Sequence, residues 1–344
     1  MARPSEVPGT MRVSVLNRPG ELELQQRPVP QPTPWHVLVA VRSVGVCGSD
    51  VHYFERGRIG DFVVRDPLVL GHEVSGRIVA AGDGVDPGRL GSRVAIEPGA
   101  ACGHCPQCTA GRYNLCPDMQ FFATPPVDGA LGEYVLVRDD LAVDLPERVS
   151  DDAAALLEPL SVGIWANGKA DVTVGGSVLI AGAGPIGLVA AQVARARGAV
   201  TIVVSDIAPH RLAAARRNGA SAALPAAEVP AACRDFDAFI DCSGAPAAIT
   251  AGIRALRPAG RAVLVGMGPD ELVLPFAFVQ QREITVTGTF RYANTWPTAI
   301  ALAASGAVDL DALVTGHFPL AEAESALRSV TQEGTIKPII EPWR

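Results

Sequence analysis

Three side chains in two short segments have the chemistry of a catalytic metal site. Cys47 opens the segment Cys47-Gly-Ser-Asp-Val-His-Tyr53, and a second segment reads Gly71-His72-Glu73. A thiolate, an imidazole and a carboxylate can hold a zinc ion while leaving one coordination position open. Neither segment is sufficient alone, because a free cysteine is more often a packing residue. A metal enzyme is therefore predicted only if the rest of the chain supports it.

Four further cysteines have the spacing of a structural zinc site. They fall within fifteen residues, at Cys102, Cys105, Cys108 and Cys116. Two-residue spacers let a turning backbone bring three thiolates to one point, and four thiolates complete a tetrahedral zinc shell with no open position. His104 lies inside this segment and is surplus to the ligand set. Cys233 and Cys242 have no partner at ligand spacing and are predicted to be structural.

The stretch from residue 177 to residue 206 carries a dinucleotide-binding fingerprint. A predicted strand over 177–181 leads into a G-x-G-x-x-G turn that opens a helix, and the next strand ends at Asp206. The glycines permit close approach of a pyrophosphate to the helix N-terminus and close packing of helix against strand. Asp206 is predicted to accept both ribose hydroxyls of NAD and to repel a 2′-phosphate. The predicted cofactor residues are Gly182, Gly184, Pro185, Ile186, Gly187, Asp206 and Arg211.

Composition limits the classes of protein and partner. At 344 residues, two domains are expected. A net charge of −7 argues against nucleic acid and anionic membrane surfaces as partners. The chain has no run of 18 apolar residues and no signal-peptide core near its start, so a cytoplasmic location is expected. Cysteines in a reducing compartment bind metal more often than they form disulfides.

The chain divides into a β-rich part and a part in which strands and helices alternate. Apolar and polar residues alternate over 11–46, which predicts short antiparallel strands, and the first 150 residues are predicted to form an irregular β-barrel. A helix is predicted from Asp151 to Pro159, and Glu158 within it is a carboxylate where burial is expected. From residue 177 the alternation predicts a parallel sheet. His317, on the surface, is predicted to begin a turn and a helix.

With these motifs in place, the chain resembles the zinc-dependent medium-chain dehydrogenases, and within them the sorbitol (L-iditol, polyol) branch. The resemblance extends from residue 11 to the end of the chain. General alcohol dehydrogenases usually have a cysteine where Glu158 stands, so this residue favours the polyol branch. The resemblance is carried by Cys47–Tyr53, Gly57–Phe62, Leu70–Glu73, Arg93–Ala100, Ala123–Pro126, Glu158–Gly163 and Phe290–Pro297.

The resemblance implies a fold and a domain organisation. It implies an α/β protein with a GroES-like, β-rich catalytic domain at residues 1–160, completed by 297–344. Residues 161–296 are expected to form a Rossmann domain with a parallel sheet that binds NAD. One catalytic and one structural zinc ion per chain, and a homotetramer, are also implied.

The resemblance also implies a role for individual residues. Cys47, His72 and Glu73 match the catalytic zinc ligands, and Glu158 matches a carboxylate close to the metal. Glu158 would reach the metal directly or through a bound water. The hypothesis is that Glu73 is the lasting ligand and that Glu158 is a neighbouring group, although the family pattern leaves room for the two to exchange during turnover. Ser49 and His52 match a relay that removes the alcohol proton. The residues that match the polyol pocket are Tyr53, Phe121, Thr124, Glu158, Arg291 and Tyr292.

The predicted activity is the NAD-linked oxidation of a polyol to a ketose. A butanediol or L-threonine dehydrogenase on the same fold is the alternative within enzymes. A nicotinamide-binding protein without catalysis is the alternative outside them, since fold alone is a poor guide to function. The sequence does not rank sorbitol, xylitol, L-iditol, ribitol and galactitol as substrates.

Overall fold

The computed structural model describes residues 7–344, which form two compact units. Unit 1 contains the chain up to Glu158 together with Leu313–Arg344, and unit 2 is Pro159–Ala312. The mixture of a β-rich unit and a parallel-sheet unit confirms the predicted α/β fold class. The predicted domain boundaries, after residues 160 and 296, stay a prediction. None of the helices in residues 7–344 has the length and apolarity needed to cross a membrane.

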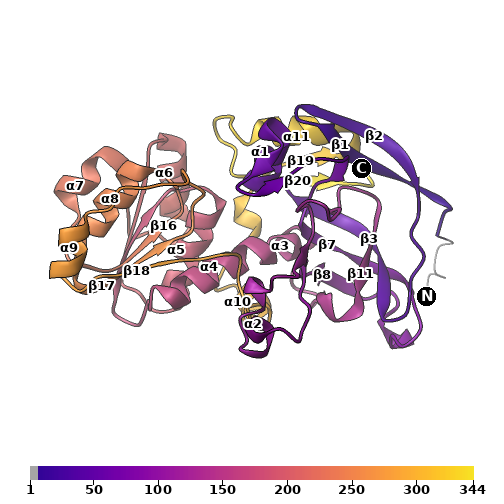
Figure 1. Cartoon of the computed structure of the whole chain (residues 1–344), viewed down its shortest axis with the longest axis horizontal. Coiled ribbons are helices and arrows are strands. Elements are labelled where there is room, and N and C mark those ends of the chain that lie inside the picture. The colour runs from indigo at the N-terminus through magenta and orange to yellow at the C-terminus, as the bar shows by residue number, and fades with distance from the viewer. Residues whose placement is uncertain (1–6) are drawn as a thin grey trace. The chain divides into compact units, whose positions relative to one another are not determined.

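Unit 1 is organised around a seven-stranded sheet with the order β12-β8-β7-β3-β20-β19, in which β11 also pairs with β3. The C-terminal strands β19 and β20 therefore complete a sheet that begins near the N-terminus (Figure 1). The central strand β3 is apolar along most of its length because both of its faces are covered. The strands of this sheet are β3 (His36–Gly45), β7 (Glu73–Ala81), β8 (Arg93–Ile96), β11 (Tyr134–Arg138), β12 (Ala142–Asp144), β19 (Val314–Pro319) and β20 (Lys337–Glu341).

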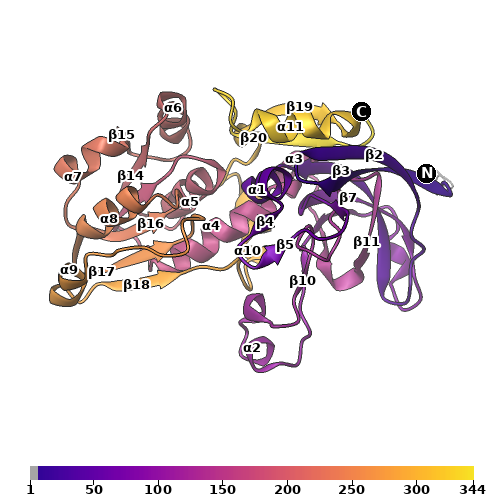
Figure 2. The same ribbon diagram turned by 45° about the horizontal axis from the view of Figure 1, so that its top comes forward.

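Smaller elements surround this sheet. The predicted antiparallel strands of residues 11–46 are present, and residues 58–63 contain the two short strands of a hairpin, β4 and β5. Figure 2 shows the segment around α2 extending from β9 and β10 as a separate lobe. The remaining elements of unit 1 are β1 (Thr10–Arg18), β2 (Glu21–Pro28), β4 (Arg58–Ile59), β5 (Phe62–Val63), β6 (Leu68–Val69), β9 (Gly99–Ala100), β10 (Gln120–Phe121), α1 (Gly48–Arg56), α2 (Pro106–Thr109), α3 (Asp151–Ala155) and α11 (Ala323–Ser329), with 3-10 turns at Pro87–Arg89, Tyr113–Leu115, Asp139–Leu141 and Leu320–Glu322.

Two local predictions were wrong. The helix predicted to end at Pro159 instead breaks after Ala155 and restarts as α4 (Leu157–Lys169). Proline is tolerated in the first turn of a helix, where its missing N–H costs no hydrogen bond, so Pro159 begins a helix here instead of ending one. His317 lies in β19 and not at the start of a helix, because the segment pairs with β20.

Unit 2 is a six-stranded, fully parallel sheet with the order β15-β14-β13-β16-β17-β18. The helices α5, α6 and α8 contact its central strands (Figure 1). The strands are β13 (Ser177–Ala181), β14 (Thr201–Asp206), β15 (Ala222–Pro225), β16 (Phe236–Asp241), β17 (Leu256–Leu264) and β18 (Thr285–Gly288). The helices are α4, which begins at the end of unit 1, α5 (Pro185–Ala196), α6 (Pro209–Arg217), α7 (Val229–Ala232), α8 (Pro246–Arg254), α9 (Phe276–Gln281) and α10 (Trp296–Ser305), with 3-10 turns at Ala226–Glu228 and Asp311–Leu313.

Candidate metal centre and nucleotide site

Cys47, His72 and Glu73 come together in unit 1. One ligand atom of each lies within 4.8 Å of the ligand atoms of the other two. Cys47 follows β3 and caps α1, whereas Glu73 opens β7, the antiparallel neighbour of β3. The pairing of Gly45 with Glu73 therefore places the two segments side by side. The donors are a thiolate, an imidazole and a carboxylate in a compact group, which fits a catalytic zinc ion.

Asp50 holds the two ligand segments together, a role that the sequence interpretation missed. Its carboxylate accepts hydrogen bonds from the backbone N–H groups of Cys47 (2.9 Å) and Gly71 (3.0 Å). Asp50 and Cys47 form a capping box at the start of α1. An acidic residue three positions after a helix cap is a recognisable signal of this arrangement. The carboxylate thus fixes the start of α1 against the backbone that precedes His72.

Asp50 also orients the imidazole of His72. Nδ1 of His72 lies 3.7 Å from Oδ1 of Asp50, and the ring of His72 lies 5.8 Å from the ring of Phe121. Burial by itself lowers the pKa of His72, but Asp50 and Cys47 raise it well above its usual value. A carboxylate behind a ligand histidine fixes the orientation of the ring and increases its basicity.

Glu73 is paired with a cation that the sequence interpretation also missed. Nζ of Lys337 lies 2.7 Å from Oε1 and 2.9 Å from Oε2 of Glu73, and it donates to the carbonyl of Val46 at 2.9 Å. Burial by itself lowers the pKa of Lys337, but Glu73, Cys47 and Glu158 raise it above its usual value. Removing one partner of a buried ion pair typically destabilises a protein by about 3–5 kcal/mol.

Glu158 is buried in the first turn of α4, at 5% exposure. Among residues 7–344, the two groups with metal-ligand spacing are the Cys47 group and the four-cysteine group, and Glu158 belongs to neither. Glu158 contributes to the elevated pKa of Lys337 and therefore lies within electrostatic range of the metal group. This arrangement supports Glu158 as a neighbouring carboxylate, which remains a hypothesis.

The predicted proton relay lies on α1. Ser49 and His52 are three positions apart, so their side chains share one face of the helix, and both are half-buried. Burial and the positive charge of Arg56 lower the pKa of His52, and Glu55 acts in the opposite direction. His52 therefore stays neutral, and able to accept a proton, at a lower pH than an ordinary histidine.

The residues predicted to line the polyol pocket belong to different units. Tyr53 and Phe121 are buried in unit 1, and Phe121 contacts the ring of His72; Thr124 is half-buried. Arg291 and Tyr292 belong to unit 2. The Arg291 guanidinium lies 4.8 Å from the ring centre of Phe290. A pocket shared by all of these residues stays a prediction.

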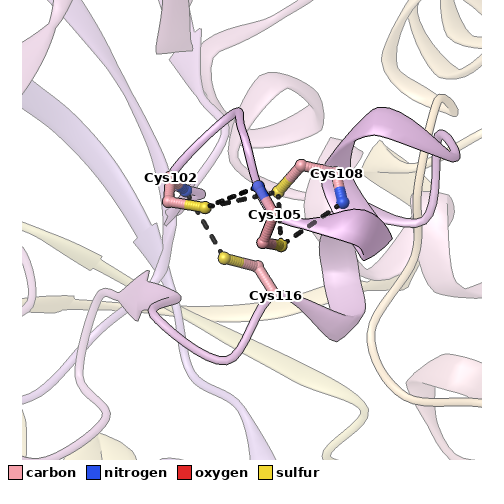
Figure 3. A group of neighbouring side chains, drawn as sticks. All are labelled: Cys102, Cys105, Cys108 and Cys116. Carbon is pink, nitrogen blue, oxygen red and sulfur yellow. Dashed lines mark hydrogen bonds between the residues drawn. The ribbon is translucent and has the colours of Figure 1, made fainter.

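The four cysteines of the lobe converge as predicted from their spacing. Their sulfur atoms lie within 4.8 Å of one another and face a common centre (Figure 3). Backbone N–H groups of His104 and Cys105 lower the pKa of Cys102 to about 6, whereas burial and the neighbouring thiols raise that of Cys108 to about 12. Four thiolates at this spacing repel one another unless a cation lies between them. The donor set therefore fits a structural zinc ion.

We expect Cys116→Ser to remove the structural zinc alone. Three remaining thiolates no longer complete the tetrahedral shell, and a lobe that depends on metal for its structure loses stability. Metal analysis should find about half of the zinc of the unmodified protein, with a lower temperature of unfolding. His104→Ala is the matched control, because the His104 side chain is exposed in the same lobe, its hydrogen bond goes to a backbone carbonyl, that of Cys102, at 2.9 Å, and the substitution leaves the backbone N–H in place. Unchanged zinc content in the Cys116 variant would contradict the site.

The nucleotide fingerprint in unit 2 has the geometry that a pyrophosphate needs. Gly182 has φ +93°, and a Cβ on Gly187 would lie 1.8 Å from the carbonyl oxygen of Gly182. Gly184 caps α5, whose first turn contains Pro185 and Ile186. A Cβ built on Gly184 would meet no atom within 4 Å, so the turn has open space at the helix N-terminus, where an anion can bind. These features fit a dinucleotide.

Asp206 stands at the end of β14, the parallel neighbour of β13. Its carboxylate accepts hydrogen bonds from the backbone N–H groups of Ala183 (2.7 Å) and Ala208 (2.8 Å). These contacts hold the carboxylate beside the glycine turn, where a ribose of a bound dinucleotide lies in this fold. Arg211 follows in α6 and is half-buried.

Unit 1 is β-rich and contains a thiolate–imidazole–carboxylate group and a four-cysteine lobe. Unit 2 is a parallel-sheet nucleotide unit. This combination defines a zinc-binding dehydrogenase. Comparisons with known proteins agree. The family model for the alcohol dehydrogenase GroES-like domain matches residues 33–147, and that for zinc-binding dehydrogenase matches residues 185–305.

Individual relatives identify the branch of the dehydrogenase family to which the chain belongs. The chain is 42% identical to sorbitol dehydrogenase of Bacillus subtilis (strain 168) over 335 residues, which cover 95% of each protein. It is 44% identical to sorbitol dehydrogenase of Homo sapiens over 326 residues, covering 92% of this chain and 91% of the relative. An Escherichia coli oxidoreductase/dehydrogenase of unknown specificity has a TM-score of 0.92 at 33% identity, covering 96% of this chain and 99% of that structure. The chain therefore belongs to the zinc-dependent medium-chain dehydrogenases, in their sorbitol dehydrogenase branch.

Proposed function

We propose that the protein oxidises a polyol of the sorbitol type to the corresponding ketose, with NAD as the hydride acceptor. The observation that carries this proposal is the compact group of Cys47, His72 and Glu73 on a dehydrogenase fold. A zinc ion bound by these residues would act as a Lewis acid that lowers the pKa of the substrate hydroxyl.

The chain's own residues direct the proton and the substrate. Ser49 would contact the reacting hydroxyl and His52, one helical turn further along α1, would pass its proton outward. NAD bound at the fingerprint of unit 2 would supply the hydride acceptor, so the products would be ketose, reduced cofactor and one proton. Glu158 and Arg291 would hydrogen-bond the other hydroxyls of the substrate. A pocket of such groups discriminates against simple alcohols, which leave them unpaired.

Substrate oxidation can be tested with a polyol panel. Sorbitol, xylitol, L-iditol, ribitol and galactitol, each with NAD, should include at least one substrate that produces reduced cofactor faster than ethanol, 2,3-butanediol or L-threonine does. Preference for 2,3-butanediol or L-threonine would replace the polyol assignment. No turnover with any of these substrates in zinc-loaded protein would count against it.

NAD is the proposed cofactor, because Asp206 would place a negative charge next to a 2′-phosphate. Asp206→Ser should weaken NAD use by about 10- to 100-fold, since hydrogen bonds to a charged group are worth about 1.5–3 kcal/mol. The preference for NAD over NADP should fall accordingly, as measured by kcat/KM with each cofactor. Equal use of both cofactors by the unmodified protein would contradict the proposal.

A homotetramer is proposed from the resemblance to the polyol branch. Light scattering after size-exclusion chromatography measures the molar mass directly. Four times the chain mass of 35.8 kDa is the expected value. A monomeric mass would contradict this proposal without affecting the proposed chemistry.

A further inference from the structure

Lys337 occupies an unusual position for a charged side chain. It is 2% exposed, and the carboxylate with which it pairs, that of Glu73, is 1% exposed. Long charged side chains are almost never fully buried unless they are paired. Three adjacent strands bring the pair together, because β7 carries Glu73, β3 lies between, and β20 begins at Lys337.

Every hydrogen-bond donor of this ammonium group has an acceptor. A lysine ammonium has three N–H groups, and the three acceptors are the two carboxylate oxygens of Glu73 and the carbonyl of Val46. A carboxylate has about four lone-pair sites. Two hydrogen bonds from Lys337 therefore leave Glu73 able to bind a metal ion at the same time.

The space around Glu73 is shaped for one orientation of its carboxylate. A Cβ on Gly45, its partner on β3, would lie 2.1 Å from Oε2 of Glu73. The carboxylate thus occupies space that any other residue at position 45 would fill. Lys337 holds the same carboxylate by both oxygens, so its orientation is fixed by the ion pair and by the available space.

Lysine is rare in this sequence. Lysine occurs only at positions 169 and 337, among a total of 29 lysines and arginines. An arginine presents five N–H donors on a planar group, which is a poor match to three converging acceptors in a buried site. The compact ammonium group is the cation that this site accommodates.

We propose that Lys337 is a positioning residue for the catalytic metal: its ammonium group fixes the Glu73 carboxylate beside Cys47 and His72. This inference rests on the proposed function, since it takes these three residues to hold zinc. Partners of metal ligands of this kind typically contribute 10- to 100-fold to metal affinity.

Metal affinity tests the proposal without measuring turnover. In a competition with a chelator, Lys337→Met should bind one of the two zinc ions about 10- to 100-fold more weakly than the unmodified protein does. In cobalt-substituted protein, the visible bands of the catalytic site should shift, because the geometry of the Glu73 ligand changes. Lys169→Met is the matched control: it removes the other lysine, which donates to the Gly288 carbonyl in unit 2, and should change neither result.

A double-mutant cycle shows whether Lys337 acts through Glu73. If it does, Lys337→Met should change the remaining affinity of Cys47 and His72 for zinc, measured at raised zinc concentration, by no more than about twofold in a Glu73→Ala background, which has no side-chain oxygen at position 73 for Lys337 to hold. A larger loss in that background would overturn the proposal, as would wild-type zinc affinity in the single Lys337→Met variant. Should Lys337→Met not fold, Lys337→Gln keeps an N–H donor without the charge, and wild-type affinity there would also overturn it.

The same measurements separate this inference from the proposed function. If the unmodified protein binds zinc only at the four-cysteine lobe, both fail together. If it binds two zinc ions and Lys337→Met leaves both affinities unchanged, the metal site stands and the role of Lys337 is refuted.

Discussion

Replacing Glu73 with alanine is expected to remove the catalytic zinc and to lower polyol oxidation by about 10³-fold or more, because the Lewis acid contributes several kcal/mol to catalysis. The variant should retain the zinc of the four-cysteine lobe, so metal analysis should find one ion per chain. Glu73→Gln is the matched control for stability. Its amide oxygen can still accept a hydrogen bond from Lys337, although it is a poor zinc ligand.

Glu158→Ala is expected to behave differently, although it removes the same type of side chain from the same neighbourhood. Both zinc ions should remain, and the loss should fall mainly on polyols, because Glu158 is assigned to a substrate hydroxyl. Charge is the reason for assigning the ligand role to Glu73 and not to Glu158. Cys47 and Glu73 already neutralise a zinc ion, and a third anionic ligand would make the metal less electrophilic. A crystal structure with Glu158 bonded to zinc at about 2.0–2.2 Å and Glu73 outside the shell would refute the assignment.

The two groups of candidate metal ligands could be predicted from the sequence because residue type and short spacing indicate them. Cys102, Cys105 and Cys108 converge on one small turn, which local backbone geometry accounts for. Cys47 and Glu73 lie on neighbouring strands, and here resemblance to a family was needed to relate them. The pairing of β3 with β7 supplies the physical reason.

The residues that support the ligands were harder to predict. Lys337 is 264 positions from Glu73, and only the insertion of β20 next to β3 brings them together. Contacts between residues so distant in sequence leave no local pattern. Asp50 is different, since its capping box with Cys47 is a local signal that could have been recognised.

The nucleotide unit was predictable in more detail than the β-rich unit. Its parallel strands are short apolar runs, such as β16 at Phe236–Asp241, and each is followed by a helical segment. The prediction that a helix ends at Pro159 was wrong for a local reason. A proline that ends one helix and a proline that begins the next look alike in sequence. His317 was misplaced because β19 is defined by its pairing with β20, and not by its own alternation.

Ser49→Ala and His52→Ala are expected to slow oxidation by interrupting proton removal. General acid–base groups contribute about 10²–10⁴-fold to rate. Ser49→Ala should give the larger loss, about 10²–10³-fold in kcat, because Ser49 would contact the reacting hydroxyl itself. His52→Ala should give a smaller loss that depends on pH. In either variant, a lower kcat with both zinc ions retained would show that the substitution does not act by disturbing the metal site.

The direction of the pH effect follows from the environment of His52. Its pKa is lowered by burial and by Arg56, so the unmodified protein keeps a neutral base to a pH below the usual value of about 6.5. At alkaline pH, hydroxide can replace the missing imidazole, and the two proteins should converge. The ratio of the oxidation rate of the unmodified protein to that of His52→Ala should therefore be greatest at the acidic end of the pH range in which His52 is neutral. A ratio that stays constant from about pH 6 to pH 10 would exclude His52 from the relay.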